Sequence, residues 1–189
     1  MRDDRVDIAA GHPPRYREPL MAELLGSPWQ LAQLNVGRPL GPIDGPVMAD
    51  FVAQLDEINA LAEASPGFVW RLVGDGGDAT DMRIDGDPDL LVNMSVWTSA
   101  EALFDYVYKS MHTKVMARRR EWFSRIEVFQ VLWWIPAGHR PTVAEATARL
   151  QLLRERGPSA DAFTFKQRYP APGELGGPSN MRPEPYCVA

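Results

Sequence analysis

The sequence predicts an α+β protein whose helices and strands follow the order βαββαβ. Short runs rich in β-branched and aromatic residues alternate with longer segments in which apolar residues recur every three or four positions. The 189 residues are 45% hydrophobic and include six Trp, which is enough for one substantial core. This order is typical of the ferredoxin-like plan, an antiparallel sheet with helices on one face.

The first half of the predicted domain contains three strands and one helix. A strand is expected over 29–36 (WQLAQLNV), and a helix over 47–64, where apolar residues are three or four apart until Ser65, Pro66 and Gly67 stop it. Two β-rich runs follow, FVWRLV and LLVNMSVW (68–73 and 90–97). The acidic loop between them, 74–89, lacks the alternation of a calcium loop, so we expect a solvated hairpin tip.

The second half adds a long helix, a strand and two further elements. Thr98 and Glu101 form a capping box, which predicts a helix over 99–123. A strand follows at 128–135 (VFQVLWWI), and a third helix runs from its cap at Thr142 to Gly157. A short strand is expected at 162–165 (AFTF). We expect an N-terminal arm at 1–27, the ferredoxin-like domain at 28–165 and a Pro/Gly-rich tail at 166–189.

The two faces of the predicted sheet differ in chemistry. In the third strand Leu90, Val92, Met94 and Val96 share one apolar face, whereas Leu91, Asn93, Ser95 and Trp97 share the other. Gln33, Asn35, Arg71, Gln130 and Trp134 give the other strands a similar split. We expect the apolar face to lie under the helices and the mixed face to form a small-molecule cavity or to be covered by a second copy. An open, solvent-facing sheet is the alternative, although it would expose two indoles.

The stretch VYKSMHTKVMARRREWF (107–123) is basic, but its cations do not form one stripe. At 100° per residue, His112 and Arg119 share a face with Tyr108, Met116 and the aromatic residues near 122. In one reading, His112 bonds a carbonyl, and Arg119 pairs with a carboxylate or keeps its head at the surface while its stem packs. In the other, His112 is a general base and Arg119 binds an anionic oxygen. The helix offers no clustered charge for nucleic acid.

The composition indicates which partners and which cellular compartment to expect. A net charge of −5 and a pI near 5.2 disfavour nucleic acid and anionic membranes, and no apolar run of 18 residues occurs. Cys187 is the only cysteine, which excludes an intrachain disulfide. We therefore expect a cytoplasmic protein. No phosphate loop, G-x-S-x-G elbow or C-x-x-C motif is present, and no two His are close enough in sequence to predict a metal pair.

Four segments of the sequence together resemble the family DUF3291. They are 59–72 (NALAEASPGFVWRL), 90–108 (LLVNMSVWTSAEALFDYVY), 112–123 (HTKVMARRREWF) and 131–150 (VLWWIPAGHRPTVAEATARL). The resemblance runs from about Trp29 to Phe165. That family is similar to the dimeric α/β-barrel superfamily, which includes antibiotic-biosynthesis monooxygenases, polyketide cyclases and muconolactone isomerase-like proteins. The resemblance implies a homodimer whose sheets pack face to face over the mixed face, and a ligand between sheet and helices. It brings no established catalytic residues.

The expected function is that of an enzyme without metal or other cofactor, acting on a small hydrophobic molecule, aromatic or polyketide-like, in secondary metabolism. The reaction is a monooxygenation or a cyclisation or isomerisation. His112, Arg119 and Tyr108 are the expected catalytic residues. The expected substrate-binding residues are Arg71, Asn93, Ser95, Trp97, Phe104, Met116, Trp122 and Trp134. Two alternatives remain: a haem or chromophore protein with His112 as axial ligand, and a non-catalytic ligand-binding or stress protein.

Overall fold

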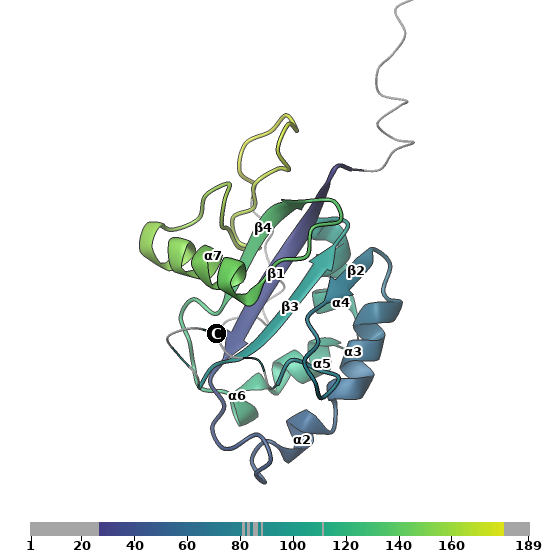
Figure 1. Cartoon of the computed structure of the whole chain (residues 1–189), viewed down its shortest axis with the longest axis vertical. Helices are drawn as coiled ribbons and strands as arrows, with labels where there is room; N and C mark the ends of the chain where they lie inside the picture. Colours follow the sequence, from purple (N-terminus) through teal and green to yellow (C-terminus); the bar gives the residue numbers. More distant parts are fainter. Residues whose placement is uncertain are drawn as a thin grey trace, which may run out of the picture.

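The computed structural model of this chain describes residues 27–80, 82, 84, 87, 89–110 and 112–179. Figure 1 shows a central sheet with helices around it. The strands are β1 (Trp29–Gly37), β2 (Phe68–Arg71), β3 (Leu91–Trp97) and β4 (Gln130–Pro136). The helices are α2 (Ala49–Val52), α3 (Leu55–Ala64), α4 (Ala100–Lys109), α5 (His112–Ala117), α6 (Arg119–Trp122) and α7 (Val143–Arg156). Among the described residues, no helix combines the length and the apolar character needed to cross a membrane.

The four strands form one antiparallel sheet in the order β2-β3-β1-β4. The first and third strands therefore lie in the centre, and each is joined to an edge strand through a helical crossover. This arrangement is the ferredoxin-like plan, so the predicted α+β fold is confirmed. The segment predicted as a short final strand makes one antiparallel bridge to the sheet, in which Phe163 and Leu132 exchange backbone hydrogen bonds of 2.9 and 2.8 Å.

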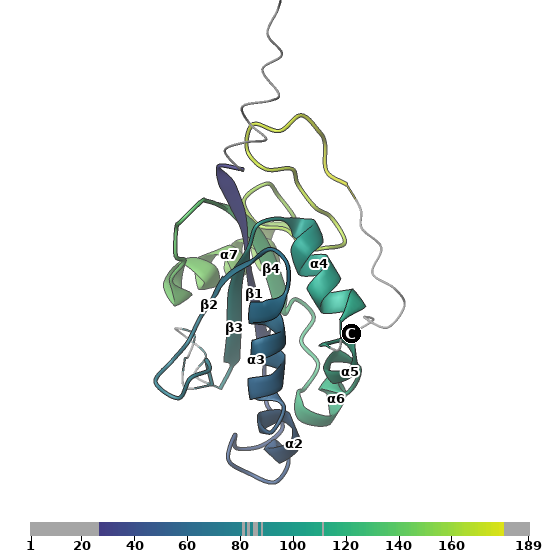
Figure 2. The same ribbon diagram turned by 90° about the vertical axis from the view of Figure 1, so that its right-hand side faces the viewer.

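The helices cover both faces of the sheet, whereas the prediction placed them on the apolar face alone. Figure 2 shows α7 on one side of the sheet and α3, α4, α5 and α6 on the other. The apolar face packs against α7, where Val92, Met94 and Val96 meet Leu150 and Leu153, and all five are buried. The mixed face lies under the crossover helices. A partner sheet is thus not what covers the mixed face, because this chain covers it.

Two predicted helices are each broken into shorter pieces. The helix expected over 47–64 is interrupted between α2 and α3, and the one expected over 99–123 is divided into α4, α5 and α6. Side-chain hydroxyl groups bond to backbone carbonyls at the break after α4: Thr113 Oγ1 donates to Ser110 O at 2.9 Å, and Ser110 Oγ donates to Tyr106 O. Such side chains compete with the helical backbone bonds. A single helical projection across 99–123 is therefore wrong.

The predicted helix ends are only partly correct. The N-cap of α4 is Ser99, whose Oγ accepts from Ala102 N at 3.1 Å, so the capping box expected from Thr98 is wrong by one residue. At α7 the prediction is confirmed. Thr142 Oγ1 accepts from Glu145 N at 3.1 Å, and Gly157 ends the helix with a φ of 74°, a conformation that favours glycine.

The acidic loop 74–89 does not simply project into solvent. Its described apolar residues Ala79, Met82 and Ile84 pack against the cluster beneath α7. Arg38, just after β1, pairs with Asp87 and, at 3.4 Å, with Asp89. The expectation of a solvated hairpin tip is therefore wrong for this part of the loop, because its apolar side chains complete the cover of the apolar face.

Residues that follow the bridge at Phe163 pack back onto the mixed side of the molecule. Arg168 donates to Glu101 Oε1 at 2.8 Å, which ties this segment to the first turn of α4. Trp134 Nε1 donates to Tyr169 O at 2.9 Å. Burial raises the pKa of Glu101, but hydrogen bonds, chiefly from Arg168, and the charge of Arg168 outweigh burial, so the net shift is downward from 4.5.

Glu101→Gln is expected to lower the free energy of unfolding at pH 7 by about 0.2–1 kcal/mol, a small value because the side chain is 67% exposed. Since the folded-state pKa is depressed, the stabilisation is complete above the unfolded-state pKa and is lost as pH falls through the folded one. Urea unfolding at a series of pH values tests this. The difference between wild type and variant should shrink toward zero in acid, and a difference that persists there would contradict the ion-pair explanation.

Candidate functional site

A cavity of about 610 Å³ lies between the mixed face of the sheet and the helices α3 to α6. Its floor includes side chains of β1 and β3, its walls come from α4, α5 and α6, and residues 123–130 close one side. Asn93 is exposed although it lies on a central strand on the face that the crossover helices cover. The helices therefore do not seal this face, and the volume is in the range of small-molecule sites.

The floor is a row of polar side chains connected by hydrogen bonds. The register places Gln33 opposite Ser95 and Asn35 opposite Asn93. Gln33 Nε2 donates to Asn93 Oδ1 at 3.0 Å and to Ser95 Oγ at 3.1 Å. Because Ser95 Oγ also accepts from Trp97 Nε1 at 2.8 Å, the network fixes the orientation of these groups.

One polar atom of this network has no partner. Gln33 is 4% exposed, and its Oε1 is buried without a hydrogen bond. Buried amide oxygens are almost always bonded, and leaving one without a donor costs about 1–3 kcal/mol. The floor of the cavity therefore contains an unused acceptor.

Aromatic rings form much of the wall. Tyr106 lines the cavity and stacks on the buried Trp97, with 5.0 Å between ring centroids and 24° between planes. Burial raises the pKa of Tyr106, so its phenol keeps its proton at neutral pH. Tyr108 and Phe165 line another part, with centroids 5.6 Å apart. The walls thus offer flat apolar surfaces, and the Tyr106 hydroxyl donates to Ile58 O at 3.4 Å.

Arg119 is held in a fixed orientation at the cavity. Its guanidinium carbon lies 4.0 Å from the ring centroid of Phe129, and its Nη2 donates to Val36 O at 3.2 Å. The stacked ring and the carbonyl fix the plane of the guanidinium. A cation placed in this way can stabilise negative charge on a bound molecule.

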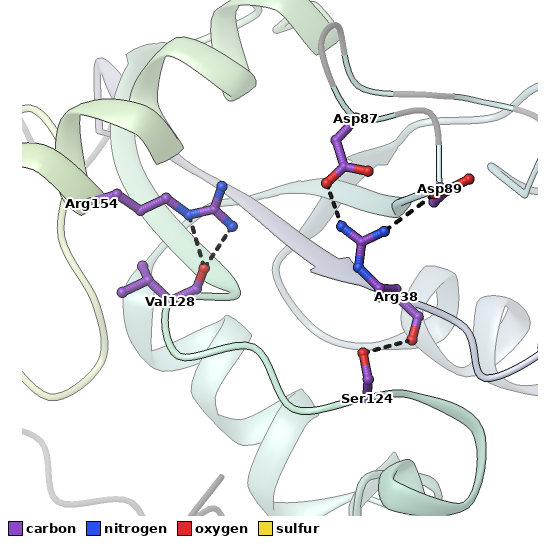
Figure 3. Close-up of polar contacts among 6 residues, drawn as sticks. All are labelled: Arg38, Asp87, Asp89, Ser124, Val128 and Arg154. Atoms are coloured by element: carbon purple, nitrogen blue, oxygen red, sulfur yellow. Dashed lines mark hydrogen bonds and ion pairs between the residues drawn. The ribbon is translucent and has the colours of Figure 1, made fainter.

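The connection from α6 to β4 forms one wall and is anchored at both ends (Figure 3). Ser124 N and Oγ donate to Arg38 O at 2.9 and 3.4 Å. Arg154 of α7 donates to Val128 O through Nε and Nη2, at 3.2 and 2.9 Å. Because Arg38 directly follows β1 and Arg154 belongs to α7, these bonds tie this wall to the sheet and to α7.

Gly37, the last residue of β1, lets Phe123 approach closely. A Cβ at position 37 would lie 2.6 Å from Phe123 Cδ1, and Phe123 lines the cavity. Gly37→Ala is therefore expected to displace the ring and to lower the free energy of unfolding by about 1–3 kcal/mol, measured by urea denaturation. Gly177→Ala, with nothing within 4 Å of the new methyl group, is the matched control and should change little. Equal effects of the two substitutions would contradict the steric argument.

The structure brings together six of the residues that the sequence predicted for the site. Arg71, Asn93, Ser95, Tyr108, Met116 and Arg119 all line the cavity. His112 begins α5, but its side chain lies outside the described residues.

The other four are not among the described lining residues. Trp97 is buried between β3 and α4, where it stacks on Tyr106. Phe104 packs against Tyr108 and Phe165, and Trp134 bonds to Tyr169 O. Trp122 packs in a separate cluster with Met48 and Leu91. Of these four, only Trp122 lies beyond the break between α4 and α5, which a single helical projection cannot include.

Sequence reasoning omitted several lining residues from the site. Gln33 and Asn35 were assigned to the mixed face but not to the site, although the same alternation that selected Asn93 and Ser95 selects them. Tyr106 faces the cavity from the helix that also supplies Tyr108. Lys166 reaches the cavity from the predicted tail, and no pattern in the sequence indicates this position. Among the described residues, no group of three or more His, Cys, Asp or Glu side chains could hold a metal ion.

Solved structures with a similar fold include three proteins of low sequence identity. SnoaB, a cofactor-independent oxygenase from Streptomyces nogalater, is 16% identical with a TM-score of 0.40, over 59% of this chain and 95% of that one. Rv0793 from Mycobacterium tuberculosis is 17% identical with a TM-score of 0.41, over 60% and 99%. A protein of Chloroflexus aurantiacus J-10-fl, described as a candidate antibiotic biosynthesis monooxygenase, is 15% identical with a TM-score of 0.34, over 61% and 99%.

Sequence identities and TM-scores this low support no conclusion about the function of this chain. No curated protein matches the chain. The model of one family does match, over residues 30–176, which is most of the sequence and includes the sheet and its helices apart from the first residue of β1. The chain therefore belongs to the family described as Domain of unknown function (DUF3291).

Proposed function

We propose that this protein is an enzyme that removes a proton from a small, hydrophobic, aromatic or polyketide-like molecule bound in the cavity and then oxygenates it without a metal or other cofactor. The observation that carries this proposal is the combination, in one cavity of about 610 Å³, of aromatic walls with a polar, hydrogen-bonded floor. Flat walls suit a ring system, and a few oriented polar groups suit the control of its reacting atoms.

The proposed first step is loss of a proton from an activated carbon. His112 is the proposed base, on the sequence argument that imidazole titrates near neutrality. The negative charge moves to a conjugated oxygen, which Arg119 stabilises because its guanidinium is already oriented by Phe129 and Val36 O. Tyr108 and Asn93, which line the same cavity, are the proposed hydrogen-bonding groups for that oxygen.

Dioxygen then reacts with the electron-rich anion. One oxygen atom forms the new carbonyl at the deprotonated carbon, and the other leaves as water with the two hydrogens of that carbon. Cyclisation or isomerisation shares the first step and differs only in what the anion attacks, so it is the second candidate. Secondary metabolism is the proposed setting, because it supplies aromatic and polyketide-like substrates of this reactivity.

Anthrone is a suitable probe, since loss of a methylene proton gives an aromatic oxyanion. We expect the protein to accelerate its conversion to anthraquinone with uptake of one O₂ for each product, measured with an oxygen electrode and by absorbance against heat-denatured protein. Binding of anthrone without acceleration would favour a non-catalytic binding protein. A Soret band in the untreated protein would favour the haem alternative.

We also propose a homodimer, as the family resemblance implies, with its contact outside the two faces of the sheet. Leu40, Val47 and Val52 are 53%, 45% and 40% exposed and come from one segment, which makes this segment the proposed contact. Light scattering of wild type and Val52→Asp tests it: we expect a dimer that the variant weakens. A monomeric wild type would refute this part of the proposal.

A further inference from the structure

Three carboxamide side chains form a row across the floor of the cavity. The register places Asn35 of β1 between Asn93 of β3 and Gln130 of β4. Residues directly opposite each other on neighbouring strands share a face of the sheet, and all three of these line the cavity. The row therefore runs across the strands, which lie about 4.8 Å apart in this direction.

Two of these carboxamides are open to a ligand. Among the described residues, the side chains of Asn35 and Gln130 make no hydrogen bond, and both are half-buried. Asn93 is already engaged, because its Oδ1 accepts from Gln33 Nε2 at 3.0 Å. A carboxamide both donates and accepts. Asn35 and Gln130 thus offer two groups of the same chemistry, one strand apart, in a cavity with aromatic walls.

The spacing of the strands favours one pattern of substitution on a bound ring. Two oxygens in meta positions on a benzene ring are separated by nearly the same distance as two neighbouring strands, whereas two ortho oxygens are much closer together. A phenolic hydroxyl both donates and accepts, so one carboxamide can satisfy each hydroxyl. Rings that form from a chain with a carbonyl on every second carbon carry their oxygens in meta positions, which agrees with a polyketide-like substrate.

We infer that the cavity selects an aromatic molecule with two hydroxyl groups in meta positions, one bound by Asn35 and the other by Gln130. This inference rests on the proposed function in taking the cavity as the substrate site, and it narrows the substrate class. Asn93, the next group in the row, is proposed above to bond the developing oxyanion. Binding at Asn35 and Gln130 therefore orients the ring beside that group and takes no part in the chemical step.

Matched biphenyl probes test the inference by isothermal titration calorimetry under argon, where neither oxygenation nor oxidation of the probes interferes. We expect 3,5-dihydroxybiphenyl, the meta isomer, to bind best. The ortho isomer 3,4-dihydroxybiphenyl and the monohydroxy compound 3-hydroxybiphenyl should each bind about five- to tenfold more weakly, the effect of one lost hydrogen bond.

Substitutions in the row test which residues read the pattern. Asn35→Leu and Gln130→Met keep the approximate size of each side chain and remove its amide. Each should lower the affinity for the meta isomer about five- to tenfold and change that for 3-hydroxybiphenyl little, because its one hydroxyl can use the remaining carboxamide. Circular dichroism checks that each variant is folded. If one is not, the other variant and the wild-type comparison of the two isomers decide the same point.

Asn59→Leu is the matched control. Asn59 of α3 also lines the cavity, is half-buried and makes no hydrogen bond among the described residues, but it does not belong to the row on the sheet. This variant should keep the full preference for the meta isomer. An equal loss of preference in Asn59→Leu would contradict the assignment to Asn35 and Gln130.

Two further results would overturn the inference: no binding of 3,5-dihydroxybiphenyl, or binding no tighter than that of the ortho isomer. These measurements need no turnover. Selective binding without anthrone oxidation would therefore refute the proposed function and leave the ligand class standing, whereas anthrone oxidation without selectivity for the meta isomer would do the reverse.

Discussion

Trp97→Ala is expected to lower the free energy of unfolding by about 3–5 kcal/mol, the largest stability change that we predict. Trp97 has no exposed surface, stacks on Tyr106 and meets the edge of Phe68 at 5.4 Å. It also donates to Ser95 Oγ, so its loss removes a support of the polar floor as well as a large apolar side chain. Urea denaturation followed by circular dichroism measures the change.

Two further substitutions separate packing from hydrogen bonding at this position. Trp97→Phe keeps a ring but loses the bond to Ser95, and it should cost clearly less than Trp97→Ala. Leu175→Ala is the control, because Leu175 is fully exposed and should change stability by less than about 0.5 kcal/mol. A Trp97→Ala variant as stable as the control would show that the floor does not depend on this indole.

His112→Ala is expected to reduce anthrone oxidation by about 10²–10⁴-fold, the contribution typical of a positioned general base. The melting temperature should stay within a few degrees of the wild-type value, since a base that faces a ligand adds little to the core. Steady-state oxygen uptake and a thermal melt on the same preparation measure both quantities.

His139→Ala is the matched control for this experiment. His139 is partly exposed, pairs with Glu145 at 2.8 Å at the start of α7, and does not line the cavity. Its substitution should leave turnover unchanged. Loss of folding in His112→Ala would assign that residue a structural role, and full activity would exclude it as the base.

The strands and the ends of α7 could be predicted because their signals are local. Alternation identifies each strand, and a hydroxyl that accepts from the backbone three residues later identifies the cap at Thr142. The prediction of one continuous helix over 99–123 was wrong, and the reason is also local. Ser110, whose extended backbone ends α4, and Thr113 bond to nearby carbonyl groups, and helical periodicity contains no sign of this competition.

Which side of the sheet each helix covers was not predictable from alternation. Both faces carry enough apolar residues to accept helices, and only tertiary packing places Leu150 of α7 against the wholly apolar one. The mixed chemistry of the other face did indicate a cavity. Its position depends on contacts distant in sequence, such as Arg154 with Val128 and Arg38 with Ser124, which no pattern in a single sequence reveals.

The cover that α7 provides has a consequence for how the site responds to dilution. Where an apolar sheet face must be buried by a second copy, the integrity of each site depends on subunit association and therefore on protein concentration. Here the same chain buries that face, so the shape of the cavity does not depend on a second copy. The affinity for a ligand should accordingly be the same at nanomolar and at micromolar protein.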